Sequence, residues 1–112
     1  MINDTLGHDV GDKYIKEAKE IISNTFKNST VFRIGGDEFV CILDENDYYT
    51  RDYLMQKINE KNDKNAKANK VTIACGISDF NPETDKKLID VFIRADELMY
   101  KNKKELKDKY NI

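Results

Sequence analysis

The sequence predicts an α/β fold in which a mixed sheet is flanked by helices. Apolar residues switch between helical spacing and short strand-like runs in the order helix, strand, strand, helix, strand, helix. The chain has 112 residues, of which 39% are hydrophobic and 36% charged, so it can bury one core beneath a well-solvated surface. We therefore expect a single domain over residues 1–112.

Composition also narrows the function classes. The net charge of -2 gives no overall attraction to nucleic acid, and no apolar run has the length of a membrane span or a signal peptide. Cys41 and Cys75 lie in apolar runs and form no CxxC pair, which favours reduced thiols over a disulfide or a metal site. These features predict a cytoplasmic protein.

The first half of the chain reads as a helix followed by a β-hairpin. Residues 13–26 carry apolar side chains at helical spacing, with Asp12 as the expected N-cap. Residues 31–34 and 38–43 are apolar runs separated by a turn with two glycines, the pattern of a hairpin. Because the second run is apolar on both faces, we expect it inside a sheet covered by helices.

The second half predicts a helix over residues 48–60, a polar loop over 62–70 and a strand over 71–78. A turn over residues 79–85 contains the only proline. A long final helix follows, and its inner stripe is predicted to consist of Leu88, Phe92, Ala95, Met99 and Leu106.

The hairpin turn carries the clearest chemical signal. Gly35 and Gly36 have no side chains, so a ligand could approach the backbone closely. The adjacent carboxylates of Asp37 and Glu38 are hard oxygen donors of the kind that Mg²⁺ prefers. Such a site suits phosphoryl chemistry, in which positioning and charge neutralisation dominate. On these residues alone, the alternative is an ordinary exposed hairpin with a polar tip.

Four motifs in order extend this reading: "INDTLGHDVGD" (2–12), "RIGGDEF" (33–39), "VTIACGIS" (71–78) and "RADELMYKNK" (94–103). Together they resemble the GGDEF family of diguanylate cyclases, and the resemblance covers residue 2 to about residue 107. It implies a palm-like, ferredoxin-related fold of the nucleotidyl cyclase type.

The resemblance also implies roles at the hairpin. Asp37 would bind the metal, Mg²⁺ or Mn²⁺, and activate the attacking 3′-hydroxyl. Glu38 would support the metal site, with a solvated carboxylate at the strand start as the alternative. Gly35 and Gly36 would let the backbone close over the nucleotide.

Further substrate contacts follow from the same resemblance. Asn3 and Asp12 match the pair that reads guanine, and amide and carboxylate groups suit its edge. Lys103 matches a lysine that reaches the triphosphate, and Lys107 stands about where members often have a phosphate-binding arginine. The only histidine, His8, is expected to form structural hydrogen bonds rather than act as a base.

Two departures from the family shape our expectations. Members carry a central strand before "INDT" that supplies a further metal-site aspartate, so we expect an N-terminally truncated domain. Loss of this strand would leave open edges on its two neighbours, whose backbone groups need partners. We therefore expect direct pairing of the two neighbouring strands, dimerisation through the open edges, or a chain trimmed from a longer protein. Residues 26–29, "FKNS", replace the RxxD product-inhibition motif, so feedback through that site is not expected.

The function implied is condensation of two GTP molecules into cyclic di-GMP, with loss of pyrophosphate, by a homodimer of facing domains. An upstream sensor or receiver domain is the expected partner, and contact with nucleic acid or membrane is not expected. The alternative is a non-catalytic GGDEF module that binds GTP or a protein partner. Replacing Asp37 should abolish turnover in the first case and spare partner binding in the second.

Overall fold

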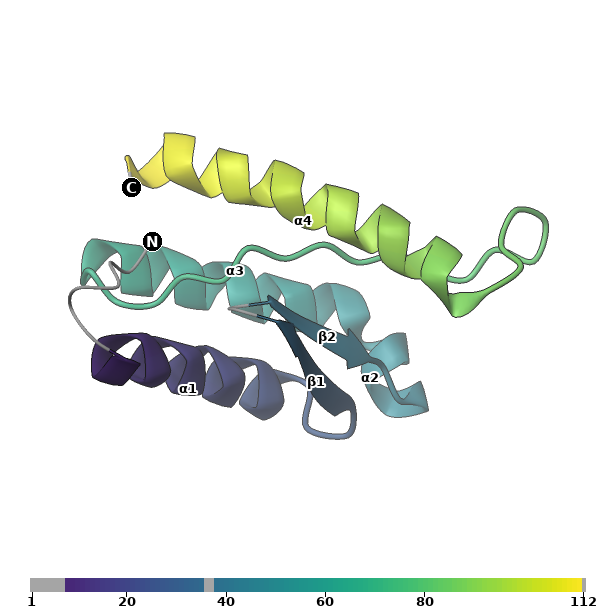
Figure 1. Cartoon of the computed structure of the whole chain (residues 1–112), viewed down its shortest axis with the longest axis horizontal. Coiled ribbons are helices and arrows are strands. Elements are labelled where there is room, and N and C mark those ends of the chain that lie inside the picture. The colour runs from purple at the N-terminus through teal and green to yellow at the C-terminus, as the bar shows by residue number, and fades with distance from the viewer. Residues whose placement is uncertain (1–7, 36–37, 112) are drawn as a thin grey trace. The chain divides into compact units, whose positions relative to one another are not determined.

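The helices and strands follow the predicted order with two differences: one predicted helix is two helices, and one predicted strand is not formed. The computed structural model describes residues 8–35 and 38–111 (Figure 1). The elements, in chain order, are α1 (His8–Thr25), β1 (Thr30–Gly35), β2 (Glu38–Ile42), α2 (Glu45–Tyr49), α3 (Arg51–Lys67) and α4 (Leu88–Tyr110). The chain divides into two compact units, Met1–Thr72 and Ile73–Ile112, and each is described by itself.

The first unit contains α1, the β1–β2 hairpin, α2 and α3. Helices α1 and α3 contact each other, and α1 also contacts β1 (Figure 1). Ile58 of α3 is completely buried, and the other buried apolar side chains here are Ala18, Ile22, Phe26 and Val71. The spacing of the α1 residues in this set is four, which places them on one helical face, as the amphipathic pattern predicted.

Helix α1 begins earlier than predicted. It starts at His8 rather than at residue 13, so Asp12 lies inside the helix and is not its N-cap. Once a helix is nucleated, each added residue contributes a further hydrogen bond, which lets it extend through the polar stretch and Gly11. The exposed carboxylate of Asp12 remains near the positive end of the helix dipole, where a negative charge is favourable.

The predicted helix over residues 48–60 is two helices, α2 and α3, and the predicted loop over 62–70 is wrong. Helix α3 continues to Lys67 because the buried Asn65 makes specific polar contacts: its Nδ2 donates to the Val71 carbonyl at 2.8 Å. Asn69 follows with φ of 56°, and Lys70 N–H bonds back to the Asn65 carbonyl at 2.7 Å. This left-handed cap ends the helix.

The hairpin is confirmed, whereas the strand over residues 71–78 is not. In the described part of the chain, the sheet contains only β1 and β2, paired antiparallel from Thr30↔Ile42 to Gly35↔Glu38. Residues 71–78 run without a strand assignment. The helices and hairpin agree with the α/β class, but a mixed sheet and direct pairing of residues 71–78 are not observed among the described residues. A strand needs a partner, and none pairs with this segment there.

The second unit is the chain from Ile73 through α4. Gly76 lies against the backbone of α4, where a Cβ would meet the Ala95 carbonyl oxygen and the Met99 nitrogen. Ser78 Oγ donates to the Val91 carbonyl at 2.6 Å, and Cys75 N–H donates to Asn102 Oδ1 at 2.8 Å. These contacts attach the extended segment to the helix along its length.

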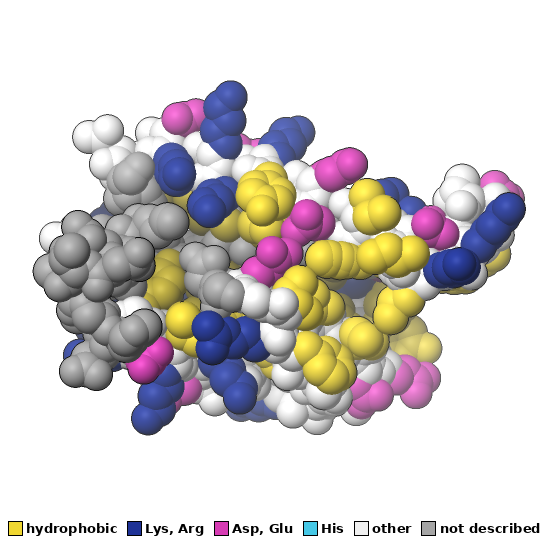
Figure 2. Space-filling view, viewed as in Figure 1, with side chains coloured by type: hydrophobic (Ala, Val, Ile, Leu, Met, Phe, Trp, Pro, Cys, Tyr) yellow, Lys and Arg dark blue, Asp and Glu magenta, His cyan; other side chains and the backbone are white. Residues whose placement is uncertain are grey.

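Helix α4 confirms the predicted final helix but not all of its inner stripe. Phe92, Ala95, Met99 and Leu106 are half-buried as expected, whereas Leu88 is 65% exposed because it is the first residue of the helix. Asp90 caps this end by accepting from the N–H groups of Lys86 and Lys87 at 2.8 and 3.1 Å. No helix in the described ranges is long and apolar enough to cross a membrane. On the face of the molecule seen in Figure 2, apolar side chains lie exposed between charged ones.

Candidate functional site

The β1–β2 hairpin is paired up to the two residues of the predicted turn, Gly36 and Asp37, which lie outside the described residues. The ladder has an irregularity between Arg33 and Gly35, after which Gly35 faces Glu38 as the last pair. Gly35 has φ of +155°, a conformation that L side chains rarely adopt, so glycine is required there by the backbone. Within RIGGDEF, the backbone of Gly35 therefore lies directly opposite that of Glu38.

The predicted metal donors are partly within the described structure. Glu38 opens β2 and is half-buried, while Gly36 and Asp37 lie outside the described residues. A carboxylate oxygen is the right donor type for Mg²⁺ or Mn²⁺. Within the part of the chain that is described, no three His, Cys, Asp or Glu side chains gather around one point. The donor chemistry of Glu38 therefore fits a divalent ion.

The base of the hairpin is fixed by a buried carboxylate. Asp47 of α2 is 5% exposed and accepts three hydrogen bonds: from Asn28 N–H at 3.1 Å, Asn28 Nδ2 at 3.3 Å and Ser29 Oγ at 2.5 Å. Ser29 Oγ in turn accepts from Asp44 N–H at 2.9 Å. Because these residues stand just before β1 and just after β2, the network joins the two ends of the hairpin to α2.

The other predicted substrate residues lie on helices. Asp12 is exposed on α1, and Lys103 and Lys107 are exposed on α4, one turn apart. Asn3 lies outside the described residues, and so does the side chain of His8. The structure thus brings Gly35 and Glu38 together and puts both lysines on neighbouring turns of α4.

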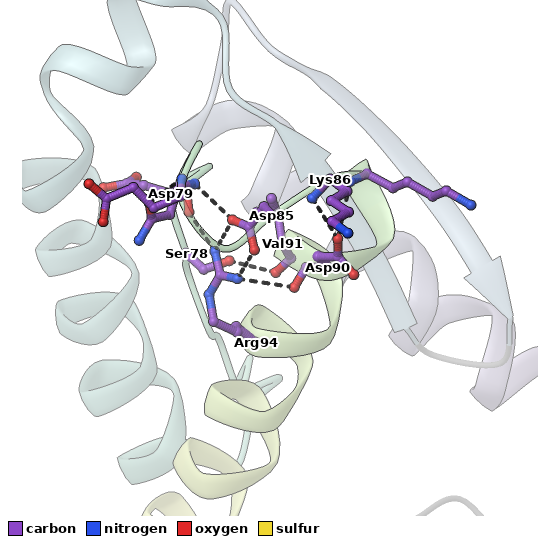
Figure 3. A network of polar contacts seen from close by, with 10 residues as sticks. Ser78, Asp79, Asp85, Lys86, Asp90, Val91 and Arg94 are labelled. Atoms are coloured by element: carbon purple, nitrogen blue, oxygen red, sulfur yellow. Dashed lines mark hydrogen bonds and ion pairs between the residues drawn. The ribbon is translucent and has the colours of Figure 1, made fainter.

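Sequence reasoning missed a second polar cluster, in the second unit (Figure 3). The buried Asp85 carboxylate pairs with both terminal nitrogens of the Arg94 guanidinium, one contact measuring 2.7 Å. Arg94 also donates to the Asp79 carbonyl at 2.7 Å, and Asp85 accepts from Asn81 N–H at 2.7 Å. The hydrogen bond from Arg94, followed by that from Asn81, lowers the pKa of Asp85 to about 2.

This cluster binds the turn over residues 79–85 to α4. The sequence signal for it is Arg94, which opens "RADELMYKNK" and follows the acidic segment over residues 79–85. Spacing alone could not identify the partner, because several carboxylates lie at similar distances along the chain. We interpret the cluster as structural, because the Arg94 guanidinium and the Asp85 carboxylate pair with each other.

Both cysteines are free thiols, as predicted. Burial raises the pKa of Cys75 to about 12. Burial, with a smaller contribution from the negative charge of Asp47, also raises the pKa of Cys41. A raised pKa keeps a thiol protonated near neutral pH, which disfavours nucleophilic attack by either side chain.

Comparison with known proteins now defines the class. Residues 1–109 match the family described as "Diguanylate cyclase, GGDEF domain". The chain therefore belongs to the GGDEF domain family. No solved structure matches it significantly.

Three curated relatives illustrate the range of sequence identity and coverage among the matches. Signaling protein YkoW of Bacillus subtilis is 34% identical, the match covering 98% of this chain and 14% of that protein. Diguanylate cyclase A of Treponema denticola is 31% identical, covering 91% and 29%. Diguanylate cyclase DgcS of Shewanella oneidensis is 27% identical, covering 99% and 38%. The chain thus spans well under half the length of these relatives.

Proposed function

We propose that this chain is the catalytic domain of a diguanylate cyclase, which condenses two GTP molecules into cyclic di-GMP and pyrophosphate in bacterial signalling. The observation that supports the proposal is the β1–β2 hairpin, in which Gly35 pairs with Glu38 at the end of the ladder. Family membership over residues 1–109 and relatives named diguanylate cyclase support it.

In this proposal the hairpin residues act on the metal and the phosphates. Asp37 and Glu38 would hold Mg²⁺ or Mn²⁺, and the ion when bound would neutralise triphosphate charge. Gly35, with its open backbone, would let the nucleotide phosphates approach closely. Asp37 would also accept the proton of the attacking 3′-hydroxyl.

The remaining substrate contacts are proposed from the motif positions. Asn3 and Asp12 would read the guanine edge, and Asp12 lies exposed on the first turns of α1, where it can reach a ligand. Lys103 and Lys107 would neutralise phosphate charge from successive turns of α4. Lysine offers a point charge rather than the two-pronged contact of arginine, so Lys107 would bind phosphate less specifically.

The larger context is also a proposal. Residues 1–112 would form one GGDEF domain with the palm-like fold of nucleotidyl cyclases, in the cytoplasm. Catalysis would require a homodimer of facing domains, each 3′-hydroxyl attacking the other's α-phosphate. Because the curated relatives are much longer than this chain, a sensor or receiver domain would be the regulatory partner.

The test is incubation of the whole chain with GTP and Mg²⁺, with cyclic di-GMP and pyrophosphate measured by chromatography. Asp37→Ala should lower the rate by about 10²-fold or more, the effect of losing one electrostatic catalyst. Glu60→Gln, an exposed carboxylate change on α3, serves as the matched control and should leave the rate unchanged.

Calorimetry with GTP separates the alternatives. Binding without any product would support a non-catalytic GTP-binding module instead. Product that forms equally well with Asp37→Ala would place the chemistry elsewhere, and absence of both binding and product would overturn the proposal.

A further inference from the structure

A groove lies between α1 and α3. Its volume is about 1200 Å³, its walls come only from the first unit, and neither Gly35 nor Glu38 lines it. Apolar parts of Tyr14, Ile21 and Leu54 contribute to its surface. A concave site of this size, combining apolar and polar side chains, can hold a small organic ligand with room to spare.

The groove carries an excess of positive charge. Five lysines line it, together with three carboxylates, those of Glu17, Glu20 and Asp47; the lysines are Lys13, Lys27, Lys57, Lys61 and Lys70. Asp47 is buried and already accepts hydrogen bonds from Asn28 and Ser29, so the five lysines outnumber the two remaining carboxylates, the half-buried Glu17 and the exposed Glu20. Lys57 has electrostatic partners: its contact with Tyr53, followed by the negative charge of Glu60, raises its pKa.

The α3 wall arranges these groups in a stripe. Tyr53, Lys57, Lys61 and Asn65 follow one another at intervals of four residues, so they lie on one face of the helix. Lys57 and Lys61 are like charges one turn apart, an arrangement that disfavours the helix unless an anion lies near both. No carboxylate of α3 lines the groove. This wall is therefore suited to a group with several negative charges, such as linked phosphates.

The end of the stripe offers an aromatic surface. Tyr53 is 58% exposed, and the Lys57 Nζ atom lies 5.3 Å from the centre of its ring. An exposed tyrosine ring provides a face on which a flat heterocycle can stack. Across the groove, the exposed Glu20 and half-buried Glu17 on α1 can accept hydrogen bonds from amino or hydroxyl groups.

We propose that this groove binds a nucleoside polyphosphate, with the phosphates at Lys57 and Lys61 and the base against Tyr53. The anionic end of such a ligand matches the lysine wall. Its base and ribose hydroxyl groups supply the donors that the two glutamates require. Neither Gly35 nor Glu38 lines this site, and its role is separate from turnover of GTP.

The probe is ATP without divalent metal, titrated into the whole chain by calorimetry. ATP should bind with an affinity that falls as salt is raised. Lys57→Gln/Lys61→Gln should weaken binding by about tenfold or more, because charged hydrogen bonds are lost. The matched control is Lys16→Gln/Lys19→Gln, which removes two exposed lysines of α1 outside the groove and should leave the affinity within about twofold of the unchanged chain.

Inorganic tripolyphosphate tests the base contact. It should bind more weakly than ATP, and Tyr53→Leu should remove that difference. Equal binding of the two probes would overturn the assignment to a nucleoside. No binding, or equal weakening by both double variants, would overturn the site itself and indicate only diffuse attraction to lysines. Circular dichroism of each variant checks folding, and failure of GTP turnover leaves this result unaffected.

Discussion

Substitution of Gly76 by alanine tests the packing of the second unit. An alanine Cβ would lie 2.9 Å from the Leu98 carbonyl carbon and closer still to the Ala95 carbonyl oxygen and the Met99 nitrogen. These obstacles are backbone atoms of α4, so a rotamer change cannot relieve them. The extended segment and the helix must separate instead.

The expected cost follows from the contacts that such a separation disturbs. Overpacking alone costs about 1–3 kcal/mol. Loosening the hydrogen bonds Cys75–Asn102 and Ser78–Val91 adds about 1 kcal/mol each. The total, roughly 3–5 kcal/mol, is a large part of the stability of a small domain and should lower the midpoint of thermal unfolding by 10 °C or more, on the order expected for this chain length.

The same substitution at Gly11 provides the control. No atom of the described residues lies within 4 Å of a Cβ at this position in α1, so Gly11→Ala should stabilise the chain by about 0.5–1 kcal/mol through helix propensity. Thermal and urea unfolding, followed by circular dichroism, measure both variants. If Gly76→Ala unfolds at the temperature of the unchanged chain, the close approach of residue 76 to α4 is refuted.

Two further predictions concern the second unit. The pKa of Asp85 is about 2, below the usual carboxyl value of about 4, so its contact with Arg94 stabilises the fold fully above about pH 4 and this contribution is lost as the pH falls toward 2. Asp85→Asn should flatten the stability curve in that window, and urea unfolding from pH 2 to 6 would contradict the reasoning if the curves stay parallel. Because burial raises the pKa of Cys75 to about 12, its thiol should react far more slowly with iodoacetamide at pH 8.5 than in urea, as measured by mass spectrometry; equal rates would show that it is not protected.

The sequence was informative wherever structure is set locally. Two glycines between apolar runs predicted the hairpin, and its strands and register agree with that reading. Helix ends were less predictable, because they depend on contacts that lie outside the segment. Asn65 is the clearest case: a polar stretch that read as a loop is helical, since this buried amide reaches the Val71 carbonyl.

In the candidate site, too, the features set by local sequence could be predicted and those set by distant contacts could not. The signature residues and the lysines of α4 could be found from motif order, and their proposed roles stay predictions. The Arg94–Asp85 cluster could not be assigned from the sequence, because pairing a buried carboxylate with one particular guanidinium is a property of the packed turn. The α1–α3 groove was equally hidden, since its lysines are scattered in sequence and share a wall only when two helices pack together.

Residues 71–78 show why a strand pattern need not produce a strand. In the first unit, the Val71 and Thr72 carbonyls accept from Asn65 and from the Tyr14 hydroxyl at 2.8 and 3.2 Å. In the second, the Cys75 N–H donates to Asn102. Side chains thus satisfy backbone groups that would otherwise bond to a neighbouring strand, and buried backbone groups require such partners. Alternation of apolar and small residues specifies an extended conformation with a face to bury, but a β-ladder also requires a second chain segment beside it. The extended form survives here because helix side chains contribute the hydrogen bonds.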